Sequence, residues 1–103
     1  MFLNAGNMDL MKADYANNQA FFDGLKAFQQ GNLYTQPFFN FNGTNIDTGI
    51  CDTYFIGATI YPDKFADVDL KAKYSEIYTT LLGVDFYQAM QQNGMDFKSM
   101  SFN

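Results

Sequence analysis

The side chains best suited to chemistry lie in the run FFNFNGTNID, which begins at Phe38. Phenylalanine rings can stack on a flat ligand, and asparagine amides can orient its polar groups. In an extended segment, Phe39 and Phe41 would fall on one side, with Phe38, Asn40 and Asn42 on the other. The run could therefore line a binding site. Alternatively, its rings pack beneath a helix and its amides satisfy the backbone of a turn.

A second candidate loop is NAGN, at residues 4–7. Glycine allows the backbone to approach a ligand closely, and the two asparagines could hydrogen-bond to it, although a plain turn explains the loop equally well. Both loops follow predicted strands, and in open α/β sheets ligands bind beyond the carboxyl ends of the strands. We therefore predict one ligand-binding site made of Asn4, Gly6, Asn7, Phe39, Asn40, Phe41 and Asn42.

Catalytic and metal-binding chemistry find little support in the remaining residues. The chain contains no histidine and one cysteine, so it cannot form a Ser-His-Asp triad, a Cys-His pair, a Cys/His zinc site or an internal disulfide. Cys51 lies on an apolar helical stripe, which favours a buried, inert thiol. Asp63, Asp67 and Asp69 lack the spacing of a calcium loop and are better explained as turn and capping residues. We therefore predict no catalytic residue, metal or cofactor, and no enzyme activity; two adjacent carboxylates in a pocket would reopen that question.

The composition indicates one folded domain over residues 1–103. Hydrophobic residues make up 48% of the chain and aromatic residues 18%, which is far from the composition of a disordered chain. The net charge of −5 disfavours nucleic acid and anionic membrane surfaces as partners, because both attract basic patches. No apolar run approaches the roughly 20 residues that span a bilayer.

Strand and helix signals alternate in the first half of the chain. A short strand is predicted at residues 2–3, then a helix over 14–30 that begins at Asp14 or Asn17, then a strand over 32–37.

The second half is more helical. Helices are predicted over 45–61, 69–82 and 85–92, with Thr44 or Asn45 as the first cap, and the tail from residue 96 is expected to be frayed. The element order predicts an α/β fold, a partial Rossmann-like lobe whose small sheet of few strands is packed with about four helices.

One long stretch resembles a known family. The run NIDTGICDTYFIGATIYPDKFADVDLKAKYSEIYTTLLG, at residues 45–83, is similar to the C-terminal end of the substrate-binding proteins of iron-complex ABC transporters. This family captures siderophores, haem and cobalamin. The upstream pieces FLNAGNMDL and LKAFQQGNLYTQPF also fit, so the resemblance covers residues 2 to about 90. It is carried by several patches: Asn45-Ile46-Asp47, Ile60 to Phe65, Asp67-Val68-Asp69, Tyr74, Ile77-Tyr78 and Leu81-Leu82-Gly83.

The resemblance implies a two-lobed, periplasmic-binding-protein-like receptor that holds its ligand between lobes joined by a rigid helix. This chain would be the second half of the C-terminal lobe. Its partners would be an iron-chelate-type small molecule and an ABC transporter permease, and its location extracytoplasmic, in the periplasm or lipid-anchored at the cell surface. A lobe that lacks some of its strands would expose an edge or an apolar face, which favours a homo-oligomer. The alternative is a small self-associating α/β interaction domain with no small-molecule ligand.

Overall fold

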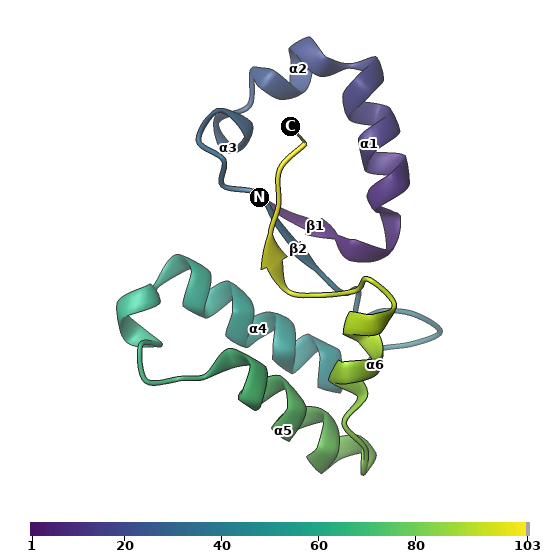
Figure 1. Ribbon diagram of the computed structural model, residues 1–103, viewed down its shortest axis with the longest axis vertical. Helices are drawn as coiled ribbons and strands as arrows, with labels where there is room; N and C mark the ends of the chain where they lie inside the picture. Colours follow the sequence, from purple (N-terminus) through teal and green to yellow (C-terminus); the bar gives the residue numbers. More distant parts are fainter. Residues whose placement is uncertain (103) are drawn as a thin grey trace.

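The computed structural model describes residues 1–102, which form an α/β fold around one small mixed sheet. Its strands are β1 (Phe2–Asn4), β2 (Tyr34–Gln36) and β3 (Lys98–Ser99), in the order β1-β2-β3 (Figure 1). β1 runs parallel to β2, and β3 runs antiparallel to it. The predicted α/β class and the two predicted strands are confirmed.

Two groups of helices connect the strands and lie on opposite sides of them (Figure 1). Between β1 and β2 come the 3₁₀ turn η1 (Ala5–Asn7) and the helices α1 (Met8–Asn17), α2 (Gln19–Asp23) and α3 (Lys26–Gln29). Between β2 and β3 come α4 (Ile46–Ile60), the 3₁₀ turn η2 (Pro62–Lys64), α5 (Leu70–Leu82) and α6 (Phe86–Gln92). None of these helices is long and apolar enough to cross a membrane.

The main core lies between α4, α5, α6 and one face of the sheet. It consists of Cys51, Phe55, Tyr74, Tyr78, Tyr87, Met90 and Phe97, and aromatic rings dominate it. The Tyr74 ring stacks on Phe97 with 4.3 Å between the centroids, and Phe55 meets both sheet rings, Phe2 and Tyr34, edge to face. These contacts hold α4 against β1 and β2, the two strands that lead into the predicted site.

The single helix predicted over residues 14–30 is wrong, because the segment forms parts of three short helices. Asn18 interrupts the first of them: it has a non-helical backbone, and its side-chain amide donates to the Asp14 carbonyl oxygen. Such local bonds compete with helix propagation. Leu25 is extended and separates α2 from α3. The predicted caps Asp14 and Asn17 both lie inside α1, which begins earlier, at Met8.

The expectation of a frayed tail is also wrong. Phe97 is buried in the core, and the Met100 amide donates to the Leu33 carbonyl oxygen at 2.9 Å. Phe102 stacks on Tyr15 and Phe28, and these rings form a second aromatic cluster beneath α1 and α3. The tail is ordered because it buries large rings on both sides of the sheet.

The helices of the second half begin and end close to the predicted residues. Asn45 precedes α4, Pro62 follows it, and the Asp69 carboxylate caps α5 by accepting from the Ala72 amide at 3.1 Å. Their predicted apolar stripes, however, are only partly buried. A group of aliphatic side chains, the α4–α5 patch, remains exposed: Ile46, Ile50, Leu81 and Leu82.

Candidate binding pocket at the strand ends

The carboxyl ends of β1 and β2 open into one pocket. Because the two strands are parallel and Asn4 is paired with Gln36, the loops that follow them leave the same edge of the sheet. The pocket has a volume of about 230 Å³. It is lined by Phe2, Leu3 and Asn4 from β1, and by Gln36, Pro37, Phe38, Phe39 and Asn40 from the end of β2 and its loop.

At Gly6 the two loops pack closely against each other. A Cβ atom built on Gly6 would come within 2.7 Å of Phe38 Cε1, so only glycine lets the ring lie this close to the loop after β1. The Gly6 amide also donates to Asn4 Oδ1 at 2.9 Å, which fixes the orientation of that side chain. Gly6 therefore shapes the site, and it does so by packing against protein.

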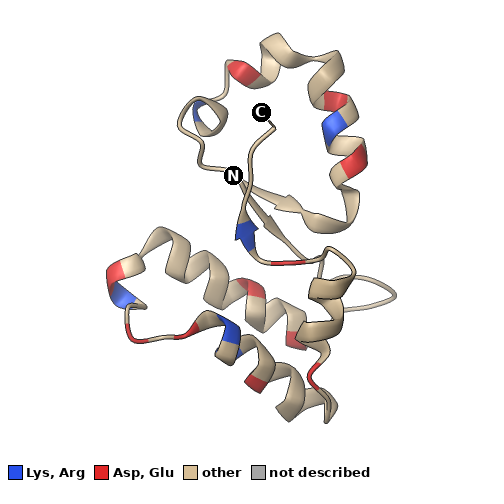
Figure 2. Cartoon of the chain, in the orientation of Figure 1, with Lys and Arg blue, Asp and Glu red and all other residues tan. Residues whose placement is uncertain are grey.

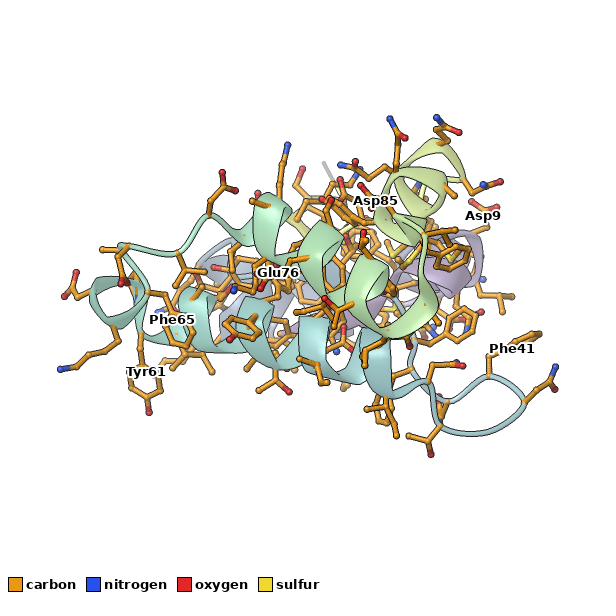
Figure 3. All side chains as sticks on the ribbon, turned by 90° about the horizontal axis from the view of Figure 1, so that it is seen from below. Asp9, Phe41, Tyr61, Phe65, Glu76 and Asp85 are labelled. Carbon is orange, nitrogen blue, oxygen red and sulfur yellow. The ribbon has the colours of Figure 1, made fainter. Side chains whose placement is uncertain are left out.

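Phe39 and Phe41 do not share a face as the alternation predicted. The segment closes on itself, because the Asn45 amide donates to the Phe39 carbonyl oxygen at 2.6 Å and Asn42 has a φ of 54°. Phe39 lines the pocket and lies against Gly49 on α4. Phe41 meets the ring of Phe38 edge to face and sits on the loop that extends away from the helices (Figure 3).

The pocket thus brings together three of the predicted site residues, Asn4, Phe39 and Asn40. Asn7 precedes α1 outside the pocket, and Phe41 and Asn42 are exposed on the outer part of their loop. Gly6 lies behind Phe38.

Sequence reasoning missed Gln36, the last residue of β2. The residue lines the pocket, while its Oε1 is buried out of reach of solvent and has no hydrogen-bond partner among residues 1–102. Leaving such an atom unpaired costs about 1–3 kcal/mol, and a ligand donor would offset this cost only if the Gln36 side chain turned toward the pocket. The signal was available: Gln36 is the final strand residue before the candidate loop, where a side chain can reach past the sheet edge.

The other side chains that could take part in acid–base or nucleophilic chemistry do not line this pocket. The Cys51 thiol is fully buried in the core, and burial raises its pKa to about 12. Asp52 is 5% exposed, its oxygens have no partner within the described chain, and burial raises the pKa of its carboxyl to about 7. Among residues 1–102, no three His, Cys, Asp or Glu side chains gather closely enough to hold a metal ion.

A second depression, of about 280 Å³, runs between α4 and α5. Ile50, Tyr54, Ile77 and Leu81 line it, together with the Lys73–Glu76 ion pair. Helix side chains alone form its walls, without a strand end or a loop. The strand-end pocket combines apolar walls with amides that have hydrogen-bonding capacity left over, so it is the better candidate for a small-molecule site.

Comparison with known proteins adds no assignment: no family model matches the sequence, and no curated protein matches it.

Proposed function

We propose that this chain belongs to the C-terminal lobe of a periplasmic-binding-protein-like receptor, of which it forms the second half. The receptor would capture an iron complex, such as a siderophore, haem or a related metal chelate, for an ABC importer. It would bind this ligand between its two lobes, perform no catalysis, work outside the cytoplasm and deliver the ligand to a permease.

The observation that carries the proposal is the shared edge of β1 and β2. Two loops that are far apart in the sequence enclose one pocket there, and an α/β receptor lobe binds its ligand at this kind of edge. The lining supports the same class of ligand. Phe2 and Phe39 offer ring surface, while Asn4, Gln36 and Asn40 offer amide groups. With a volume of about 230 Å³ the pocket would hold part of an organic chelate, and the rest of the ligand would lie against the other lobe.

Calorimetric titration of the chain with a ferric trihydroxamate, haem and cyanocobalamin tests the proposal. We expect saturable binding of at least one of them and a raised melting temperature in its presence. Phe39→Ala should weaken that binding about tenfold or more, because the ring lines the pocket.

Phe21→Ala is the matched control. Phe21 is a more exposed phenylalanine on α2, outside the pocket, so its loss should leave the affinity unchanged. Equal losses of affinity in the two variants would contradict the proposed site. Absence of binding of all three compounds to the complete two-lobed receptor would contradict the proposed function.

The α4–α5 patch favours a second candidate, a self-associating interaction domain. Its four aliphatic side chains lie next to one another. Leu81 and Ile50 line the depression between α4 and α5, and Leu81 also lines a second hollow, together with Ile46 and Leu82. Contiguous exposed apolar surface of this kind commonly marks a protein interface.

Sedimentation velocity over a range of concentrations tests self-association. If the patch is the interface, Leu81→Lys should convert a dimer to a monomer, whereas Leu10→Lys, at a more exposed leucine on α1, should not. A monomer at every concentration of the unmodified chain would rule this candidate out.

A further inference from the structure

We propose that Asn42 is a site of spontaneous deamidation, at which the chain modifies its own exposed loop without an enzyme. The loop connects β2 to α4 and spans residues 37–45. The reaction needs water as its only co-reactant and is independent of the receptor function.

The reaction begins at the Gly43 amide. After losing its proton to hydroxide, the Gly43 nitrogen attacks the side-chain carbonyl carbon of Asn42, and a new N–C bond forms while the bond to Nδ2 breaks. Nδ2 leaves as ammonia, and a five-membered succinimide ring remains. Water then opens this ring at one of its two carbonyl groups, which gives aspartate or isoaspartate. Asparagine followed by glycine is favoured in this reaction, because glycine has no Cβ atom to hinder the attack.

The sequence contains this dipeptide twice, at Asn42-Gly43 and at Asn93-Gly94. All four residues are exposed, and a Cβ atom built on either glycine would meet nothing within 4 Å. Access of water and steric crowding therefore do not distinguish the two sites. Their hydrogen bonds do.

At the second site, both reacting groups are held. The Asn93 Nδ2 group donates to the Ala89 carbonyl oxygen at 2.8 Å, and the Gly94 amide donates to the Gln91 carbonyl oxygen at 3.0 Å, both at the end of α6. These two bonds must break before the side chain can meet the nitrogen. They therefore raise the barrier to ring closure.

At Asn42, neither reacting group is held. Within residues 1–102, the Asn42 side chain and the Gly43 amide make no hydrogen bond. Asn42 has a φ of 54°, so the backbone already bends at the reacting pair. Figure 3 shows the part of the loop that carries Phe41 reaching away from the helices, where water has access to the succinimide.

The products change the loop in two ways. Residues 27–46 contain no charged side chain, so a carboxylate at position 42 would be the first charge in this stretch (Figure 2). Isoaspartate also adds one carbon to the main chain between Phe39 and Asn45, whose hydrogen bond of 2.6 Å closes the loop. Deamidation would therefore loosen the loop that carries Phe39 into the strand-end pocket.

Peptide mapping by mass spectrometry tests the proposal on folded protein incubated at mildly alkaline pH. We expect the exchange of an amide for a carboxyl group to proceed about tenfold or more faster at Asn42 than at Asn93, because only Asn93 must first break two hydrogen bonds. An L-isoaspartate methyltransferase should label the peptide that contains residue 42.

Unfolding in guanidinium is the matched control. Both dipeptides then lose their structure, so the two sites should react at similar rates. In the folded protein, Asn42→Gln should abolish the early product, since ring closure through the longer side chain is slow, whereas Asn93→Gln should leave it unchanged.

Two results would overturn the proposal. One is an equal rate at the two sites in the folded protein. The other is an Asn42 that stays intact in the folded protein and reacts once the chain is unfolded.

Discussion

Gly6 and Phe38 are in van der Waals contact across the sheet edge, where a methyl group on Gly6 would overlap the Phe38 ring at 2.7 Å. Gly6 is not one of the glycines with positive φ, so its backbone alone would tolerate alanine. The requirement for glycine is therefore one of space. This close packing fixes the turn after β1 against Phe38, the second residue of the loop after β2.

Gly6→Ala should therefore destabilise the protein by about 1–2 kcal/mol, the usual cost of overpacking by one methyl group. Urea denaturation would measure this. Phe38→Leu in the same background should recover part of the loss, because the smaller side chain removes the overlap. A Gly6→Ala variant as stable as the unmodified protein would show that the ring moves away freely.

The buried hydroxyl pair of Thr48 and Tyr78 makes a second prediction. Their oxygens lie 2.8 Å apart between α4 and α5, and both residues are buried. Tyr78→Phe should cost about 1–2 kcal/mol, since it leaves the threonine hydroxyl unpaired.

Adding Thr48→Val to Tyr78→Phe should cost little more, because neither polar partner then remains. Tyr61→Phe, at an exposed tyrosine, is the control and should be neutral. Strictly additive losses in this double-mutant cycle would argue against the hydrogen bond.

Asp52 predicts a pH dependence of stability. Burial raises the pKa of its carboxyl to about 7, well above the ordinary value, so the folded state holds this proton more tightly than the unfolded state does. The stabilisation is complete below about pH 4 and is lost progressively as the pH rises toward and through 7.

Asp52→Asn removes the charge, so its stability relative to the unmodified protein should improve by a few kcal/mol between pH 5 and pH 8. Urea midpoints at the two pH values would show this. Asp67→Asn, at an exposed aspartate, should show no such change. An Asp52→Asn variant with the same pH profile as the unmodified protein would mean that the carboxyl titrates normally.

The Cys51 thiol should be unreactive in the folded state. It is fully buried, and burial raises its pKa to about 12, so almost no thiolate exists at neutral pH. Ellman's reagent should release no colour from the native protein within minutes and one equivalent after unfolding in guanidinium. Rapid labelling of the native protein would contradict the burial.

Phe102 should stabilise α1 and α3 through its ring contacts. Its centroid lies 4.9 Å from that of Tyr15 and 5.4 Å from that of Phe28. Phe102→Ala should cost roughly 1–3 kcal/mol through the loss of two aromatic pairs and should raise amide exchange in α1 more than in α5. Phe86→Ala, at an exposed ring on α6, should leave exchange in α1 unchanged. Uniform acceleration in both helices would mean that the tail contributes to global stability alone.

Elements with strong local signals could be predicted from the sequence. α4 ends before Pro62, and α5 lies between Asp69, whose carboxylate caps it, and Gly83, which has a positive φ. Asn45 occupies the N-cap position of α4 but makes no capping hydrogen bond through its side chain. The end of β2 could be predicted in the same way, because Pro37 follows its last residue. Burial of the helix faces was harder to predict, because it depends on what packs against each stripe. Ile46 and Leu81 are periodic with the core residues and yet remain exposed.

Features that depend on distant partners could not be predicted in this way. The two-residue strand β3 has no periodicity of its own. It exists because β2 offers a free edge and because the Thr35 hydroxyl donates to the Asp96 carbonyl oxygen at 3.1 Å. At the pocket, we expected the two loops to leave the same edge of the sheet, and Asn4 and Phe39 do lie together there. We expected Phe41 beside Phe39 because we took the loop to be extended, but the loop turns at Asn42.

The position of β3 has a consequence for synthesis in the cell. β2 lies in the middle of the sheet, but its second neighbour is made of residues 98–99, and Phe97 and Phe102 close the two aromatic clusters from the same short segment. The helices α4 and α5 can pair as they emerge from the ribosome, since their contacts are close in sequence. The sheet and both clusters stay incomplete until translation has passed residue 102. Until then, the nascent chain presents unsatisfied strand edges and bare rings, and both features promote association with other chains.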